Sequence, residues 1–168
     1  MGIVYWDEII VEKWSILVAW TERGLCYVGS FIETFEHFNI WQEKYYPQAE
    51  VVRYNGESVY TEQLFQYFNR QRTQFDVPLD LKGTPFQLSV WQELTKIPYG
   101  KTVAYSYIAK AINNPKAVRA VGRVIGQNPL TIVIPCHRVI GKNGKLTGFR
   151  GGLEMKEVLL ALEKPYEL

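Results

Sequence analysis

The hydrophobic pattern of the first half alternates between strand-like and helix-like segments. Residues 15–20 and 25–28 are apolar, β-rich runs separated by Thr21-Glu22-Arg23-Gly24, which predicts a β-hairpin. Further along, the pattern predicts helices at 34–45 and 58–70 and short strands at 51–54 and 75–77. We therefore expect the first half to be a small unit of sheet and helices.

The second half begins with a strong helix-start signal. Thr84 is suited to the N-cap, Pro85 to the first helical position, and Gln87 completes a capping box, so a helix is predicted to run to about Lys96. Before it, residues 78–83 contain two helix breakers and no long apolar run. This segment is the predicted linker between two domains.

Two short helices follow. The first is predicted at 106–112, and the second runs from Pro115 to Gly126, which together form a helix-turn-helix pattern. In the second helix, two faces repeat at i, i+3 and i+7: an apolar face of Val118, Val121 and Ile125, and a basic face of Lys116, Arg119 and Arg123. Small residues such as Ala120 keep this helix narrow, which favours close approach to a groove.

The last part of the chain contains a conspicuous cysteine. The β-branched run 131–134 predicts a buried strand that ends at Pro135, so Cys136 is expected just past a strand end. Asn143-Gly144 favours a tight hairpin within 141–145, a candidate wing, and 153–164 predicts a closing amphipathic helix.

Charge separates the two halves. Net charge is only +2, but residues 1–79 carry −5 and residues 80–168 carry +7; from Leu94 to Leu153 there are ten Lys or Arg and no Asp or Glu. Such asymmetry indicates nucleic acid or an anionic membrane. Ordinary solvated surfaces mix both signs, which favours nucleic-acid contact over a merely soluble helix. We find no spanning segment, secretory signal or myristoylation signal, and expect a cytoplasmic protein, or a nuclear one if the source has a nucleus, without membrane association.

The two cysteines suggest different roles. Cys26 alternates within a strand pattern and is expected to be buried and inert, whereas Cys136 lies among cations that lower a thiol pKa. Together with His37 and His137 the cysteines fit no zinc spacing, so no metal site is expected. His37 is interpreted as a half-exposed helix residue.

Two kinds of thiol chemistry can be compared. A hydrolase needs a base in direct contact with the sulfur, but side chains adjacent in an extended chain, such as Cys136 and His137, point to opposite faces. A water could bridge them. Alkyl transfer requires less: a thiolate, an in-line electrophilic carbon and a proton donor for the leaving group. Its thioether product would not be reversed.

The motifs of residues 80–165 resemble those of O6-alkylguanine-DNA alkyltransferases. They are Gly83-Thr84-Pro85-Phe86-Gln87 with Val90-Trp91, the segments 98–105 and 114–122, Gln127-Asn128-Pro129, and Pro135-Cys136-His137-Arg138. The resemblance implies an α+β fold: a ribonuclease-H-like sheet domain at 1–79, and a mostly helical DNA-binding and alkyl-transfer domain at 80–168 with a helix-turn-helix and wing. Residues 1–79 match only in outline.

The resemblance also implies a reaction and roles for particular residues. Cys136 would accept the alkyl group of O6-alkylguanine, and secondarily of O4-alkylthymine, once and without a cofactor. His137 would activate it through a water, oriented by Glu163. Tyr105 would protonate guanine N3, and Asn128 would organise the turn beneath. The target nucleotide would leave the duplex through the minor groove of DNA bound by a monomer, with Arg119 in its place. The other implied contacts are Lys116, Ala120, Arg123 and Lys101 for DNA, and Pro135, Val139, Phe149 and Arg150 for the substrate pocket.

Two other classes stay open. A lesion-sensing protein would share the DNA surface but replace the cysteine, and Cys136 argues against it. A helix-turn-helix regulator would read the major groove and favour Asn or Gln on its recognition face, where this chain has Lys116, Ala120 and Arg123. Arg138 is expected to be structural or to face phosphate. Phe149-Arg150-Gly151-Gly152 departs from the family pattern in the loop over the substrate, and the zinc site of some relatives cannot be assembled from Cys26 and His37.

Overall fold

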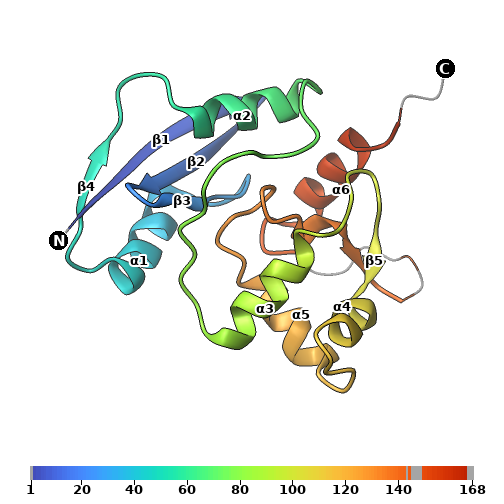
Figure 1. The fold of residues 1–168 in the computed structure, drawn as a ribbon. Coiled ribbons are helices and arrows are strands. Elements are labelled where there is room, and N and C mark those ends of the chain that lie inside the picture. The colour runs from blue at the N-terminus through green and yellow to red at the C-terminus, as the bar shows by residue number, and fades with distance from the viewer. Residues whose placement is uncertain (1, 143, 145–148, 166–168) are drawn as a thin grey trace. The chain divides into compact units, whose positions relative to one another are not determined.

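The computed structural model divides the chain into two compact units, Met1–Lys82 and Gly83–Leu168 (Figure 1). The structure describes residues 2–142, 144 and 149–165. The division lies three residues beyond the predicted boundary because the linker is bonded to the first unit: the Leu25 N–H donates to the Pro78 carbonyl at 2.9 Å, and the Asp80 N–H donates to the Leu25 carbonyl at 2.8 Å.

The N-terminal unit contains a four-stranded sheet in the order β3-β2-β1-β4. Its strands are β1 (Ile3–Val11), β2 (Trp14–Thr21), β3 (Gly24–Val28) and β4 (Glu50–Arg53). The hairpin of β2 and β3 was predicted, and β1 pairs antiparallel with β2 and parallel with β4. The sequence did not predict β1, because Asp7 and Glu8 interrupt its apolar residues.

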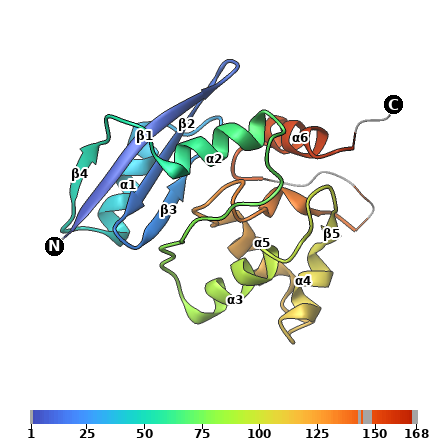
Figure 2. The same cartoon turned by 45° about the horizontal axis from the view of Figure 1, so that its top comes forward.

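One helix covers each face of this sheet (Figures 1 and 2). Helix α1 (Phe35–Tyr45) places Phe38 in a buried cluster with Leu17 and Ala19. On the opposite face, helix α2 (Val59–Phe68) brings Tyr60 against Trp20, with 5.3 Å between the ring centroids. Because successive strand residues point to opposite faces, Ala19 and Trp20 serve different helices. Cys26 is buried in β3, as predicted.

The predicted strand at 75–77 is wrong. This segment is irregular, and the side chain of Gln63 takes the place of a strand partner: it accepts from the Asp76 N–H at 2.9 Å and donates to the Asp76 carbonyl at 3.3 Å. Backbone groups can be satisfied by a side-chain amide as well as by a sheet.

The C-terminal unit is mostly helical. It contains α3 (Pro85–Leu94), α4 (Tyr105–Ala111), α5 (Val118–Gly126) and α6 (Leu153–Leu162), the 3-10 helix η1 (Cys136–Arg138), and a small parallel sheet of β5 (Val103–Ala104) and β6 (Val139–Ile140). The predicted capping box is present between Thr84 and Gln87. The indole N–H of Trp91 donates to the Val124 carbonyl at 2.9 Å and joins α3 to α5.

The start of α5 differs from the prediction. The helix begins at Val118 and not at Pro115, because the Ala117 N–H donates to the Asn114 carbonyl at 3.0 Å and closes a turn. Lys116 therefore lies in the turn before the helix, while Arg119 and Arg123 remain exposed on it. Val121 and Ile125 are buried, so the apolar face is oriented as predicted.

Two other expectations concern the end of the chain and membranes. The predicted hairpin at 141–145 includes Asn143 and Lys145, which lie outside the described residues. The closing helix ends at Leu162, so Glu163 is its C-cap. Among the described residues, none of the helices has the length and apolar character needed to cross a membrane.

We predict that Gly24→Ala destabilises the protein. Gly24 has φ +147°, and a β-carbon there would lie 2.4 Å from the Pro78 carbonyl oxygen, so strain and a backbone clash combine. We expect the free energy of unfolding, measured by urea denaturation, to fall by about 2 kcal/mol or more. Gly29→Ala is the matched control, because its β-carbon would meet atoms only at 3.4 Å and beyond. Equal effects of the two substitutions would contradict this account.

Candidate active site

Two tight turns, and not a strand, lead to Cys136. The predicted strand at 131–134 is wrong: Ile132 has φ +77°, and the Val133 N–H donates to the Thr131 carbonyl at 2.9 Å, which defines a γ-turn. A second, inverse γ-turn is centred on Pro135, where the Cys136 N–H donates to the Ile134 carbonyl at 2.7 Å. Positive φ at a β-branched residue is strained and persists only where surrounding contacts enforce it.

Asn128 supplies those contacts. This residue is buried just after α5, and its side-chain amide donates to the Ile134 carbonyl at 2.8 Å. Its side-chain oxygen accepts from the Leu130 N–H at 2.9 Å. Both ends of the segment before Pro135 are therefore bonded to one amide, which replaces the sheet that a β-branched run would otherwise need.

The thiol of Cys136 is almost completely buried, with 5% of the residue exposed, at the first position of η1. Burial raises the thiol pKa, and this effect outweighs Asn128, Arg150 and Lys156, which each lower it. The cations do act in the predicted direction, but the cost of burying a thiolate is larger.

His137 is completely buried behind the cysteine. Its Nε2 lies 2.7 Å from Oε2 of Glu163. Since a carboxylate can only accept, Nε2 carries the proton and Nδ1 holds a lone pair. Within the described part of the chain, Nδ1 has no hydrogen-bond partner. Burial lowers the histidine pKa, with Arg138 and Lys156 acting in the same direction and Glu163 opposing them.

Cys136 and His137 do not lie in extended chain as the sequence suggested. In a 3-10 helix, successive side chains diverge by about 120° instead of pointing to opposite faces. The two side chains thus point in different directions from the same turn, and direct pairing remains unfavourable.

Glu163 accepts hydrogen bonds from Arg138 as well as from His137. Arg138 donates from Nε to Oε1 at 2.7 Å and from Nη2 to Oε2 at 2.9 Å, and its Nη1 donates to the Ile97 carbonyl at 2.7 Å. Burial alone would raise the glutamate pKa, but the hydrogen bonds from His137 and Arg138 outweigh it and lower the pKa to about 2. Glu163 is therefore ionised at neutral pH.

Two cations of the site, Arg138 and Lys156, are buried, which was not predicted from the sequence. Arg138 faces neither solvent nor phosphate, because it is 7% exposed and bound to Glu163. Lys156, on the inner side of α6, is 1% exposed and donates to the Val139 carbonyl at 2.6 Å. The burial of Lys156 could not be predicted from its position between Met155 and Leu159, because Lys side chains are rarely buried.

Among the residues expected at the substrate pocket, Pro135 adjoins Cys136 in the chain, and Arg150 is near enough to lower the thiol pKa. Pro135 and Val139 are buried, whereas Phe149 and Arg150 are half-buried. Arg150 donates from Nη2 to the Thr131 hydroxyl at 2.9 Å. The Val139 carbonyl accepts from Lys156 and retains a second lone pair.

Tyr105, expected to protonate the guanine, and the residues expected to contact DNA lie on α4 and α5 or in the segments just before them. Tyr105 is half-buried at the first position of α4, and its ring would lie 3.7 Å from a β-carbon at Gly122 on α5. Ala120 is half-buried on α5. The basic residues of this group are exposed: Lys101, Lys116, Arg119 and Arg123.

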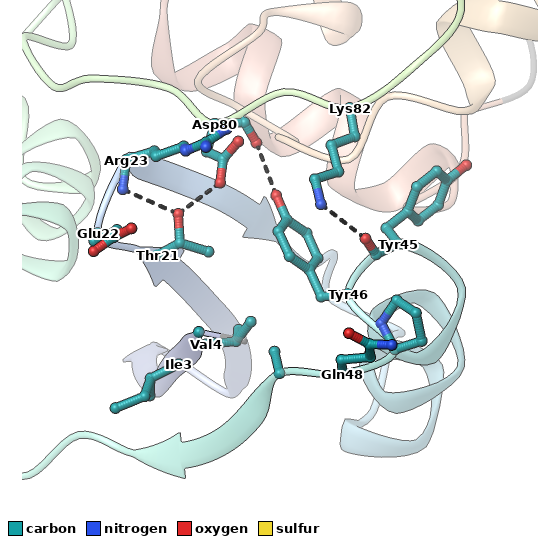
Figure 3. Close-up of a pocket in the computed structure, with 13 residues that line it drawn as sticks. Ile3, Val4, Thr21, Glu22, Arg23, Tyr45, Tyr46, Gln48, Asp80 and Lys82 are labelled. Carbon is teal, nitrogen blue, oxygen red and sulfur yellow. Dashed lines mark hydrogen bonds between the residues drawn. The ribbon is translucent and has the colours of Figure 1, made fainter.

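A separate pocket lies in the N-terminal unit, with a volume of about 370 Å³ (Figure 3). In it, the Thr21 hydroxyl donates to Asp80 at 2.6 Å, and Lys82 donates to the Tyr45 carbonyl at 3.0 Å. These bonds attach the linker to the sheet domain. No cysteine or histidine lines the pocket, and the described residues contain no cluster of three or more His, Cys, Asp or Glu able to hold a metal.

The fold and site define a helix-turn-helix protein with a buried cysteine, histidine and glutamate in one compact unit. A family model described as the DNA-binding domain of 6-O-methylguanine DNA methyltransferase matches residues 85–165. The inducible methylated-DNA–protein-cysteine methyltransferase of Bacillus subtilis is 48% identical over 96% of this chain and 90% of the relative. The chain belongs to the methylated-DNA–protein-cysteine methyltransferase family.

Solved structures agree with this assignment. The crystal structure of the O6-methylguanine methyltransferase of Mycobacterium tuberculosis superposes with a TM-score of 0.82 at 40% identity, covering 96% of this chain and 93% of that one. A structure of the M. tuberculosis protein in complex with DNA gives a TM-score of 0.82 at 39% identity, covering 95% and 92%. The predicted mixed fold, a small sheet unit followed by a helical unit, is confirmed.

We predict that acid destabilises the protein partly through His137. Its pKa is lowered from the ordinary 6.5 by folding, and that of Glu163 is lowered from 4.5 to about 2. Below these ordinary values the unfolded chain binds more protons than the folded one. The contribution of His137 to the free energy of unfolding is therefore complete above pH 6.5 and declines as pH falls. We expect His137 to contribute a slope of up to about 1.4 kcal/mol per pH unit.

Urea denaturation at a series of pH values measures this slope. His137→Asn lacks the titrating ring, so its stability should decline less steeply below the ordinary histidine pKa. Parallel slopes for the two proteins would show that the ring does not titrate as described.

Proposed function

We propose that this protein repairs DNA by transferring the alkyl group of O6-alkylguanine to Cys136, once per protein molecule. The observation that carries the proposal is a buried thiol, with His137 and Glu163 behind it, in the same compact unit as a helix-turn-helix that exposes Arg119 and Arg123. The names of the relatives and the M. tuberculosis complex with DNA support it.

The thiol needs help to react, because burial keeps it protonated. The Nδ1 lone pair of His137 can accept the thiol proton through one water, while Nε2–H stays bonded to Glu163. The thiolate then exists mainly at the moment of reaction, within a pocket that a bound base closes from solvent.

The transfer itself is a displacement at carbon. The Cys136 sulfur forms a bond to the alkyl carbon as the bond from that carbon to O6 breaks, and the electron pair remains on the guanine. Tyr105 donates a proton to guanine N3, and the proton taken from the thiol returns to Tyr105. Guanine is thereby restored, and Cys136 remains as a thioether. Nothing in this scheme regenerates the thiol, which accounts for a single turnover.

DNA recognition is assigned to the helix-turn-helix. The exposed Lys101, Lys116 and Arg123 would neutralise phosphates, and the small Ala120 would allow α5 to enter the minor groove. Arg119 would fill the gap left by the rotated nucleotide. Rotation costs a few kcal/mol and costs least at a mispaired base, which favours lesions. The protein is proposed to act as a monomer.

We predict that duplex DNA containing O6-methylguanine methylates Cys136 with one methyl group per protein and no turnover. Peptide mapping by mass spectrometry identifies the modified residue, and Cys26→Ala is the matched control that should react normally because Cys26 is buried in the other unit. An unmodified Cys136 after excess substrate would refute the proposed function.

We also predict that Arg119→Ala slows repair of duplex DNA far more than reaction with free O6-benzylguanine. The free base needs no rotation out of a duplex, so a residue that fills the gap should matter only for DNA. Single-turnover rates on the two substrates measure the difference, with Lys110→Ala on α4 as an exposed control. If Arg119→Ala lowers both rates by the same factor, its role lies elsewhere.

A further inference from the structure

We propose that Arg138 is a positioning residue for the alkyl transfer: by pairing with both oxygens of Glu163, it keeps His137 neutral and able to take the thiol proton. The inference rests on the proposed function and extends it to Arg138, which contacts neither the Cys136 thiol nor the guanine base in the proposed reaction. Its basis is the hydrogen-bond geometry around one buried carboxylate.

Arg138 and His137 share the Glu163 carboxylate unequally. Arg138 bonds to both oxygens, at 2.7 and 2.9 Å, whereas His137 bonds to Oε2 alone, at 2.7 Å. Bidentate guanidinium–carboxylate pairs are among the strongest and most directional in proteins. The third Arg138 bond, to the Ile97 carbonyl at 2.7 Å, fixes the guanidinium from the opposite side.

This arrangement settles which group carries the positive charge. A buried carboxylate needs one compensating cation, and Arg138 is always charged. A second positive charge on His137 would be buried with the guanidinium, and would gain little from a carboxylate that is already paired. Without Arg138, protonation of His137 would balance the buried negative charge of Glu163 at the lowest cost in free energy.

The protonation state decides whether His137 can work. A neutral ring with its proton on Nε2 presents a lone pair at Nδ1, but an imidazolium presents two donors and cannot accept a proton. The site therefore differs from a serine-protease triad, in which the carboxylate has no arginine and stabilises the imidazolium. In this site His137 passes the proton on. It does not need to remain protonated, because Arg138 already balances the charge of Glu163.

Of the other charged groups that act on His137, Lys156 on α6 adds a further positive charge that disfavours an imidazolium, and Cys136 is a neutral thiol at rest. Tyr99 lies beside Arg138, with 5.7 Å between the guanidinium carbon and the ring centroid. Glu163 is the negative group in this set, so its pairing is decisive.

Nuclear magnetic resonance of the imidazole nitrogens tests the assignment without using the alkyl-transfer reaction. The chain has two histidines, so His37→Gln identifies the ring signal of His137. In the unsubstituted protein at neutral pH, we expect a neutral His137 with its proton on Nε2. A ring protonated on both nitrogens would overturn the proposal, whatever the variants show.

Variants then test whether Arg138 is the cause. In Arg138→Gln, we expect the midpoint of the His137 titration to rise by about one pH unit or more, a tenfold change in proton affinity. The acid limb of the rate of reaction with free O6-benzylguanine should move upward by the same interval. Arg138→Lys keeps the charge and should show a smaller shift. An unchanged midpoint in folded Arg138→Gln would overturn the proposal, because a purely structural arginine would lower the rate equally at every pH.

A double variant keeps the proposal testable if Arg138→Gln alone does not fold. Arg138→Gln combined with Glu163→Gln leaves no unpaired buried charge, and the amide oxygen can still accept from Nε2. We expect the His137 midpoint there to be no higher than in the unsubstituted protein, and a higher midpoint would overturn the proposal. Failure of Cys136 to be methylated by DNA, with the titrations as expected, would instead refute the proposed function and leave the role of Arg138 in charge pairing intact.

Discussion

The buried carboxylate of Glu163 is the interaction on which the rest of the site depends. It lies at the C-cap of α6, where the helix dipole disfavours a negative charge, and it is held there by Arg138, His137 and, at 3.5 Å, the N–H of Gly100. Through these bonds one residue connects α6, η1 and the loop before β5. Removing either partner of such a pair leaves an uncompensated buried charge, which typically costs about 3–5 kcal/mol. Breaking the pair would therefore destabilise the fold, and we propose that the pair also sets the protonation state of His137.

Charge in the C-terminal unit consequently has two separate uses. The acid-free stretch from Leu94 to Leu153 suggested one continuous positive surface. Arg138 from this stretch is turned inward against Glu163, and Arg150 is half-buried against Thr131, while Arg119 and Arg123 stay exposed on α5. We propose that the buried cations act on the chemistry, while the exposed ones are available to phosphates. Because burial raises the thiol pKa, the thiol is proposed to stay neutral until a bound base and His137 provide a path for its proton.

The sequence predicted those features that depend on local signals. The capping box of Thr84 and Gln87, the hairpin of β2 and β3 and the burial of Cys26 all follow from residue type and spacing. Predictions failed where a distant side chain replaced a regular partner: Gln63 satisfies the backbone at Asp76, and Asn128 bends the β-branched run at 131–134 into γ-turns. The partners of Arg138 and the burial of Lys156 could not be predicted either, since a count of charges does not reveal which of them fold inward.

The ionisation of the resting thiol tests the central claim, that Cys136 is held neutral until substrate arrives. In Cys26→Ala the chain retains one cysteine, so the ultraviolet absorbance of its thiolate can be followed against pH. We expect Cys136 to remain protonated at neutral pH and to titrate above the ordinary thiol pKa of 9.0. A thiolate signal already present at neutral pH, with a midpoint below that value, would show that the resting thiol is not held neutral.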